Sequence, residues 1–311
     1  CGCPLTLMLS SGTGTGTGTE QRSGLGSNGR GYTRDWEKSM PFVDNGDVTI
    51  HYLDEGDGEP VVLLHGHTQD RRIWNSVVGP LVAAGLRVIR PDLRGHGKST
   101  RPDFGYHPSH HAGDLEALFD ASSLPSATLV GYSIGGAIAL ETALTRPDRL
   151  TALVLVAPVM PNRPYEPAFM DCLKEVARVV RSEGVESAMA GPWAECPLFE
   201  HSFSKAGVRE QAERITRDFP GAEYLATERD RVDRDWSVPD RLGEIAVPTA
   251  VVVGDHDMAG FQEWAKVAAQ GIPNPTLDRL HDCGHLVPLE APDRLAEAIV
   301  EVTDRTRPLS N

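Results

Sequence analysis

One serine, set between an apolar strand pattern and an apolar helix pattern, constrains the fold of this chain more than any other feature. Residues 127–132 (ATLVGY) are small or apolar, as in a buried strand, and residues 135–147 continue at helical spacing. Between them Ser133 has Gly131 and Gly135 two positions away on either side. This arrangement is typical of a nucleophile elbow, a turn so tight that side chains beside the serine would clash. The alternative is that Ser133 is an ordinary helix N-cap.

Strand patterns and helix patterns alternate along most of the chain. The continuous apolar run at 60–66 is expected for a strand buried on both faces of a parallel sheet. The alternation predicts an α/β fold, a mostly parallel central sheet with helices on both faces and right-handed crossovers. Strands are predicted at 47–56, 60–66, 86–97 (running into a glycine-rich loop), 127–133, 150–158 and 248–257. Helices are predicted at 73–85, 111–123, 135–147 and 292–305.

The pattern changes between residues 161 and 243. Charged, amphipathic helical segments occupy 166–184 and 209–219, and no strong strand pattern occurs there. A helical insertion between two strands would cover the carboxyl edge of the sheet, where ligands bind in such folds. We therefore interpret 161–243 as a helical cap on a core formed by 40–160 and 244–311. The alternative is an extra helical layer packed away from any site.

The first 39 residues differ from the rest of the chain. Residues 1–39 contain a Gly/Thr/Ser-rich tract that cannot form a buried core, so we expect an extension that is disordered. The folded pattern begins at Met40, which favours a natural start there and a cytoplasmic protein. The alternative is a processed bacterial lipoprotein anchored through a lipid on Cys1.

Composition excludes several classes of partner. The 311 residues are 40% hydrophobic, enough for a full-sized core, and carry a formal net charge of −14. Nucleic acid and anionic membrane surfaces are therefore unfavourable partners, and no apolar run reaches the ~18 residues of a membrane span. An odd number of scattered cysteines favours neither a disulfide framework nor a metal motif and suits a reducing compartment. The cysteines are Cys1, Cys3, Cys172, Cys196 and Cys283.

A serine nucleophile needs a base and an oxyanion-binding site. Downstream of Ser133, Asp255 and Asp257 follow the predicted end of a strand, and His285 lies in a loop before the last predicted helix. The order serine, aspartate, histidine is that of the catalytic residues in the α/β-hydrolase fold.

At this point the chain resembles the α/β-hydrolase superfamily, in particular its lid-bearing serine esterase, lactonase and haloperoxidase-like group. The resemblance extends from residue 41 to the C-terminus. It is specific for the fold and the catalytic residues but says little about the substrate. It rests on the segments LLHGHTQDRRIW, VIRPDLRGHGKS, GYSIGG, VVVGDHD and CGHLVPLEAP.

The resemblance implies a role for each matching residue. Ser133 matches the nucleophile and His285 the general base and acid. The family's acid lies three residues after the glycine that ends its strand, which here is Asp257 after Gly254. Asp255 matches a turn or supporting residue, although it stays open as the alternative acid. The carboxylate orients the imidazole and stabilises its cation.

The resemblance also implies an oxyanion hole formed by the backbone N–H groups of Ile134 and His67. Many relatives have an apolar or aromatic residue at the position of His67, so its imidazole could touch the substrate or merely cover the site. His65 and the DLRGHGKS segment are interpreted as structural, holding loops beside the site. The residues concerned in that segment are Asp92, Arg94, Gly95, His96 and Gly97.

No metal or other cofactor is expected. His110 and His111 are adjacent and precede Asp114, but neighbouring histidines at a helix start point in different directions. We interpret them as part of a solvated helix start.

A serine nucleophile with histidine and aspartate implies acyl transfer through a covalent acyl-enzyme. Serine in place of aspartate disfavours epoxide hydrolase and haloalkane dehalogenase activity, and Ile134 disfavours the proline-iminopeptidase-like relatives, which usually have tryptophan there. We expect a carboxylesterase for small, largely apolar esters. The alternatives are an enol-lactonase, thioesterase, carbon–carbon bond hydrolase, perhydrolase or cofactor-free haloperoxidase, or a ligand-binding member without activity.

The substrate pocket is expected to draw on apolar side chains of the cap, although these could equally form the cap's own small core. The sequence makes no prediction of the oligomeric state. The candidates for the pocket are Met170, Trp193, Phe199, Phe203, Phe219 and Trp236.

Overall fold

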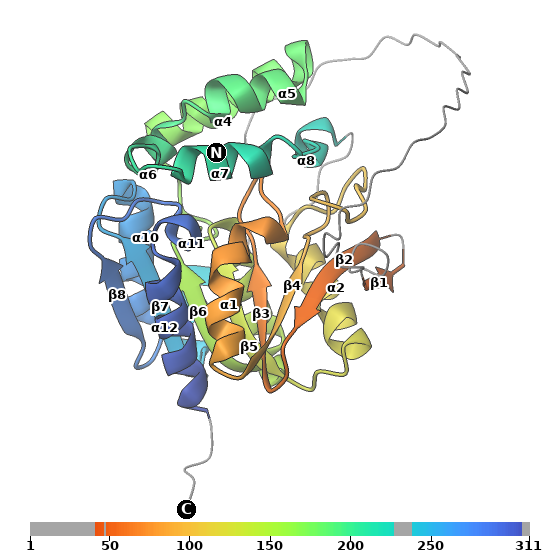
Figure 1. Cartoon of the computed structure of the whole chain (residues 1–311), viewed down its shortest axis with the longest axis vertical. Helices are drawn as coiled ribbons and strands as arrows, with labels where there is room; N and C mark the ends of the chain where they lie inside the picture. The colour runs from red at the N-terminus through yellow and green to blue at the C-terminus, as the bar shows by residue number, and fades with distance from the viewer. Residues whose placement is uncertain (1–40, 47, 227–237, 307–311) are drawn as a thin grey trace, which may run out of the picture. The chain divides into compact units, whose positions relative to one another are not determined.

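The computed structural model describes residues 41–46, 48–226 and 238–306 (Figure 1). The predicted disordered extension, residues 1–39, lies outside the described residues, as does Trp236.

An eight-stranded sheet forms the centre of the described fold, with strand order β1-β2-β4-β3-β5-β6-β7-β8. Its strands from β4 to β8 run parallel to one another, whereas β1 pairs with β2, and β2 with β4, in antiparallel fashion. This confirms the predicted mostly parallel sheet. The strands are β1 (Phe42–Asn45), β2 (Val48–Glu55), β3 (Glu59–Leu64), β4 (Leu86–Pro91), β5 (Ala127–Tyr132), β6 (Leu150–Val156), β7 (Thr249–Gly254) and β8 (Thr276–Leu280).

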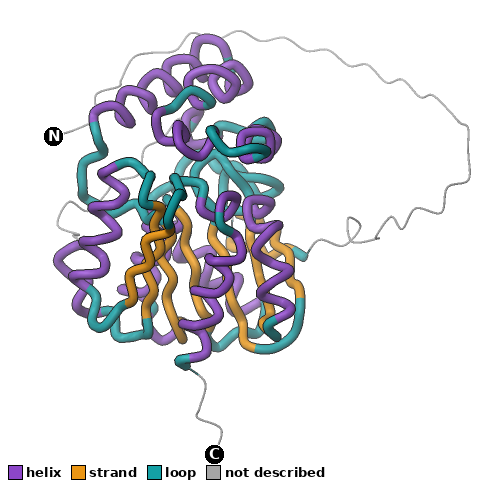
Figure 2. Tube along the Cα trace, turned by 60° about the vertical axis from the view of Figure 1, so that its left-hand side comes forward, coloured by secondary structure: helices purple, strands orange, loops and turns teal. Residues whose placement is uncertain are grey.

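Helices cover both faces of the sheet, as predicted (Figure 2). On one side α1 (Asn75–Ala83) packs against α12 (Pro292–Asp304), which also contacts β6 and β7. The other layer contains α2 (Pro108–Ala121), α3 (Ile134–Thr145) and α10 (Ala259–Gly271). Every residue of β5 and β7 is buried, which explains their uninterrupted apolar sequences. The described residues also form two short helices, α9 (Val238–Arg241) and α11 (Val287–Glu290).

A helical insertion lies between β6 and β7 and covers one edge of the sheet (Figure 1). Its longest helix buries apolar residues at helical spacing, including Phe169, Val176 and Val180. Arg72 ties this insertion to the core, because its guanidinium donates to the carbonyl of Ile215 at 3.2 Å. The helices are α4 (Pro167–Glu183), α5 (Val185–Ala188), α6 (Glu200–Phe203), α7 (Val208–Thr216) and α8 (Ala222–Leu225).

The predicted helical insertion is therefore confirmed, while its limits at 161 and 243 stay a prediction. None of the helices in the described ranges is both long and apolar enough to span a bilayer.

Apart from the short helices, three elements in the described ranges were not predicted from the sequence. β1 and β8 are short strands at the two edges of the sheet, and most residues of β8 are exposed or half-buried. Edge strands lack the continuous apolar run that marks a central strand, so their pattern is weak. The third is α10, which follows the loop containing Asp257.

Candidate active site

Ser133 occupies the turn between β5 and α3. Its backbone has φ 55° and ψ −115°, a region that residues other than glycine rarely adopt. A hydrogen bond of 2.9 Å from its N–H to the carbonyl of Val156 helps to hold this conformation. The helix begins at the next residue, Ile134, so the serine hydroxyl stands at a helix N-terminus where negative charge is stabilised.

The structure brings Ser133, His285 and Asp257 together in one hydrogen-bonded chain. His285 Nε2 lies 3.1 Å from Ser133 Oγ, and His285 Nδ1 lies 2.9 Å from Asp257 Oδ2. All three side chains are buried. Burial raises the pKa of Asp257, while the charge of His285 and its hydrogen bond act in the opposite direction. The arrangement allows His285 to accept a proton from the serine hydroxyl and Asp257 to stabilise the resulting cation.

Asp255, the alternative acid, points to a different partner. Its Oδ2 lies 3.0 Å from Nδ1 of His281, and its Oδ1 accepts a 3.4 Å hydrogen bond from the N–H of Cys283. Both partners belong to the loop that carries His285. The geometry therefore favours Asp257 as the partner of His285 and gives Asp255 a supporting position.

The predicted oxyanion donors flank the serine. The backbone N–H groups of His67 and Ile134 make no hydrogen bond within the described ranges, so both are available to a ligand. Thr68, directly after His67, has a positive φ of 60°, which marks a strained loop at this point. Two free N–H groups beside a nucleophile are the arrangement that stabilises a tetrahedral oxyanion.

The imidazole of His67 contacts the cap. Its Nδ1 lies 2.8 Å from Glu223 Oε1, and its Nε2 lies 2.7 Å from the hydroxyl of Tyr224. Trp193 and Phe219 pack edge-on against the ring, with centroids at 5.4 and 5.6 Å. The side chain of His67 therefore joins α8 to the loop after β3, residues 65–70, which we call the oxyanion loop after its predicted role.

His65 and His96, which we interpret as structural residues, are both buried. His65 Nε2 accepts a hydrogen bond from the N–H of Leu93 at 2.9 Å, and its Nδ1 lies 2.9 Å from the carbonyl of Gly66. These two partners require a neutral ring with the proton on Nδ1. Burial lowers the pKa of both histidines to about 4.

The DLRGHGKS loop is held by buried carboxylates. Asp92 accepts hydrogen bonds from the N–H of Arg71 at 3.0 Å and of Lys98 at 2.9 Å. Arg94 forms a bidentate pair with Asp114, at 2.6 and 2.7 Å. A side chain at Gly97 would collide with the carboxylate of Asp92. These contacts support the structural interpretation of the loop.

The histidine pair beside Asp114 does not form a ligand set. Asp114 is engaged by Arg94 and also accepts from the amide of Asn45 at 2.9 Å. His111 is buried rather than solvated, which corrects the expected exposed helix start, and burial lowers its pKa well below the usual value. The reason is that α2 begins at Pro108, so His111 lies within the helix and faces the core.

Two cavities meet at Ser133. The smaller, of about 20 Å³, contains Ser133 and His285 together with cap residues that include Trp193 and Phe199. The larger, of about 310 Å³, is lined by His67, Ser133, Ile134, Val159, Tyr165, Phe169, Leu173, Glu223, Tyr224 and Phe261. A cavity of about 20 Å³ has room for roughly one water molecule, so the larger cavity is the one that can hold a group of a substrate.

Of the residues predicted to line the pocket, some line a cavity and others pack against neighbouring rings. Trp193 and Phe199 line the smaller cavity, whereas Phe203 stacks on Phe199 at 5.2 Å between centroids and Phe219 packs on His67. Met170 is not among the residues lining either cavity in the described part of the chain.

The sequence did not reveal the residues that line the larger cavity. Glu223 and Tyr224 belong to a four-residue helix, too short to produce a periodic pattern. Phe261 is the exception, because its position four residues after Asp257 is a signal that the sequence does contain. In the structure its ring centroid lies 4.4 Å from that of His285.

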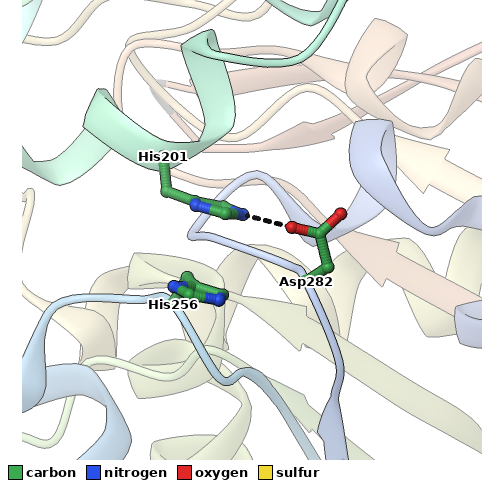
Figure 3. A group of neighbouring side chains, drawn as sticks. All are labelled: His201, His256 and Asp282. Carbon is green, nitrogen blue, oxygen red and sulfur yellow. Dashed lines mark ion pairs between the residues drawn. The ribbon is translucent and has the colours of Figure 1, made fainter.

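One group of side chains outside the site has metal-binding residue types. His201 of α6 and the loop residues His256 and Asp282 place possible ligand atoms within 4.8 Å of one another (Figure 3). The two imidazole rings are stacked, with centroids 4.1 Å apart and planes at 4°. Parallel rings cannot both direct a nitrogen lone pair at one ion, so this arrangement is an ion-pair cluster, with His201 Nε2 3.2 Å from Asp282 Oδ1.

Similar proteins of known family and structure share the fold described above. The sequence model of the Alpha/beta hydrolase family matches residues 61–298. A 2-hydroxy-6-oxo-6-phenylhexa-2,4-dienoate hydrolase of Comamonas testosteroni is 28% identical over 83% of this chain and 92% of that protein. An epoxide hydrolase of Caballeronia sordidicola is 37% identical, but over only 37% of this chain and 36% of its own length. The solved structure of a thermophilic esterase from Thermogutta terrifontis has a TM-score of 0.72 at 28% identity, covering 87% of this chain and all of that one (100%).

Proposed function

We propose that this chain, which belongs to the alpha/beta hydrolase family, is a serine hydrolase that cleaves carboxylic esters of small, largely apolar substrates. The observation that carries the proposal is the chain of hydrogen bonds from Asp257 through His285 to Ser133, at 2.9 and 3.1 Å. The larger cavity of about 310 Å³ lies at the lower end of the usual range for small-molecule sites, which favours small substrates.

The proposed reaction has two halves. Ser133 Oγ bonds to the ester carbonyl carbon while its proton passes to His285 Nε2, and the N–H groups of His67 and Ile134 stabilise the oxyanion. The carbon–oxygen bond to the alcohol then breaks, and His285 returns the proton to the departing oxygen. Water then gives a proton to His285 and bonds to the acyl carbon, the bond from that carbon to Ser133 Oγ breaks, and His285 returns the proton to Oγ as the carboxylic acid leaves. Asp257 keeps the imidazole oriented and stabilises its cation throughout.

The nature of the nucleophile separates this proposal from two activities found among similar proteins. Epoxide hydrolases and haloalkane dehalogenases of this fold use a carboxylate nucleophile that becomes an ester, and this chain has Ser133 at that position. The similarity to the epoxide hydrolase covers about a third of that protein (36%).

Carbon–carbon bond hydrolysis is the second candidate, because a dienoate hydrolase resembles this chain over most of its length. A dienoate substrate carries a carboxylate. The larger cavity contains the carboxylate of Glu223, and no lysine or arginine occurs among its described lining residues. A second carboxylate would be repelled there, so we favour an uncharged ester over a dienoate. Enol-lactonase, thioesterase and haloperoxidase or perhydrolase activity use the same serine chemistry and stay as alternatives.

Covalent labelling tests the proposal directly. A fluorophosphonate should phosphonylate Ser133, with the modified peptide identified by mass spectrometry, and Ser133→Ala should prevent labelling. Ser187→Ala, at an exposed cap serine, is the matched control and should label like the unmodified protein. Hydrolysis of short-chain p-nitrophenyl esters, tested beside lactones and dienoates, then assigns the substrate class. Absence of label at Ser133 would contradict the serine mechanism.

A further inference from the structure

The larger cavity combines aromatic walls with a single carboxylate. Four of its lining side chains are phenylalanine or tyrosine, three from the predicted cap (161–243) and one from the core. These are Tyr165, Phe169, Tyr224 and Phe261. The ring centroids of Tyr165 and Phe169 lie 5.2 Å apart, and those of Phe169 and Phe261 lie 5.8 Å apart, so three rings form one continuous wall.

Glu223 supplies the negative charge of this cavity. Its side chain is 30% exposed, and only its Oε1 has a partner, His67, within the part of the chain that the structure describes. Burial opposes ionisation, but the charge and hydrogen bond of His67 hold the pKa of Glu223 below its usual value. Both ring nitrogens of His67 are engaged, Nδ1 by Glu223 Oε1 and Nε2 by the Tyr224 hydroxyl at 2.7 Å, so among the described residues Glu223 Oε2 is the carboxylate oxygen left for a cationic ligand.

We propose that the larger cavity is a subsite for an alkylammonium group of the ester substrate, held by the aromatic wall and by the carboxylate of Glu223. A quaternary or protonated amine is attracted to aromatic ring faces within about 6 Å, and more strongly where water is excluded. The carboxylate adds a direct charge interaction. This inference rests on the proposed esterase function, because it names the class of substrate that the same site would take.

A matched pair of substrates isolates the positive charge. Choline butyrate and 3,3-dimethylbutyl butyrate have the same acyl group and nearly the same shape, with a quaternary nitrogen in one and a quaternary carbon in the other. We expect kcat/KM for the choline ester to exceed that for the neutral ester by about tenfold. Equal values in the unmodified protein would overturn the proposal.

Two variants assign the preference to the cavity. Glu223→Gln keeps the size of the side chain and removes its charge, so the ratio of the two kcat/KM values should fall by about fivefold or more. Taking the ratio cancels any general effect of the variant on the oxyanion loop through His67. Glu210→Gln removes the same charge from the exposed surface of α7 and should leave the ratio unchanged. An equal loss in both variants would mean that overall charge attracts the choline ester, and the subsite would be wrong.

A binding measurement separates failure of the subsite from failure of the esterase function. Choline should raise the melting temperature of the Ser133→Ala protein and should have no such effect when Glu223→Gln is added. If neither ester were hydrolysed but this shift occurred, the subsite would stand and the esterase proposal would fall. If the neutral ester were hydrolysed without a preference or a shift, the esterase would stand and the subsite would fall.

Discussion

At Ser133 the backbone conformation determines where the side chain lies. A φ of 55° at a residue with a side chain is costly, and the surrounding bonds to β6 and α3 must hold it in place. The hydroxyl itself makes a bond only to His285 among the described residues. Its contribution to stability is therefore small compared with its proposed contribution to the reaction.

Ser133→Ala should accordingly lose ester hydrolysis by about 10⁴-fold or more while retaining the fold. Initial rates on a p-nitrophenyl ester give the activity, and circular dichroism with a thermal melt gives the folded state. Residual turnover above roughly a thousandth of the original rate would indicate another nucleophile.

The two aspartates after β7 offer a comparison between neighbouring positions. Asp257→Asn leaves an uncharged amide 2.9 Å from His285 Nδ1, so the imidazolium loses its stabilising charge and its tautomer is no longer fixed. We expect kcat to fall by about 10⁴-fold. Asp255→Asn removes the charge next to His281, which is outside the reacting chain, and should cost less than about tenfold. If the order of the two losses were reversed, Asp255 would be the acid.

The residues that could be predicted are the proposed catalytic residues, because they lie next to recognisable sequence patterns. Ser133, Asp257 and His285 each follow a recognisable strand or glycine pattern, and their order along the chain narrows the choice. Glu223 offered no such signal, because a charged residue in a short cap helix resembles any solvated surface residue. Its importance comes from contact with His67, 156 positions away in sequence, and only the fold brings the two together.

At the scale of elements, the approach of α3 to β3 depends on glycine. A Cβ atom at Gly135 would lie 2.6 Å from the carbonyl oxygen of Leu64 and 2.8 Å from that of His65. Both oxygens belong to backbone at the start of the oxyanion loop, so neither can move aside without shifting His67.

Gly135→Ala should therefore destabilise the protein by about 3 kcal/mol, although alanine is the better helix former. Gly79→Ala is the matched control, since Gly79 also lies inside a helix and an added Cβ would meet nothing within 4 Å. We expect that variant to be neutral or more stable by up to about 1 kcal/mol. Urea unfolding measures both, and equal stabilities would show that the elbow tolerates a side chain.

The same distinction explains which elements were predictable. Central strands such as β5 are buried on both faces and read as apolar runs, while β1 and β8 contact the core on fewer sides and lose that signal. The cap helices were recognisable by amphipathic spacing, but their placement over Ser133 followed only from the expected position of an insertion in such a sheet.

The proposed mechanism has no step for a metal ion. Chelation with EDTA should therefore leave hydrolysis unchanged. The cluster of His201, His256 and Asp282 provides the check, because it joins α6 to both loops that carry Asp257 and His285. One result would show that an ion acts through this cluster. Activity would be lost on dialysis against EDTA, and added Zn²⁺ would restore it in the unmodified protein but not in His256→Gln.

At the scale of the whole molecule, cap and core are joined through charged and titratable groups. Arg72 pairs with Asp218 of the cap at 2.8 Å, Lys205 of the cap contacts Asp282 of the core, and His67 binds Glu223. The buried histidines His65 and His96 must also stay neutral in the folded protein, because burial disfavours their charged form. The stability of the whole fold should therefore depend on pH.

The direction of that dependence follows from the buried histidines. His65 and His96 have folded-state pKa values of about 4, against about 6.5 in an unfolded chain, so between these values the unfolded state binds more protons. Stability should be complete above pH 6.5 and should fall progressively towards pH 4. The buried His111 acts in the same direction as His65 and His96, because its pKa is also lowered well below the usual value, whereas burial raises the pKa of Asp92 and Asp257, which has the opposite effect on stability.

Between pH 5 and pH 7.5 the histidines should therefore dominate, and the free energy of unfolding in urea should decrease as the solution is acidified. His65→Gln should be less stable at pH 7.5, because it loses part of the bonding to Leu93 and Gly66, but its stability should depend less steeply on pH. His281→Gln, at a side chain that is 92% exposed, should keep the original slope. A slope unchanged by His65→Gln would mean that other groups cause the acid sensitivity. In that case the protonation of His65 would be of no consequence to the fold, despite the bond that its Nε2 accepts.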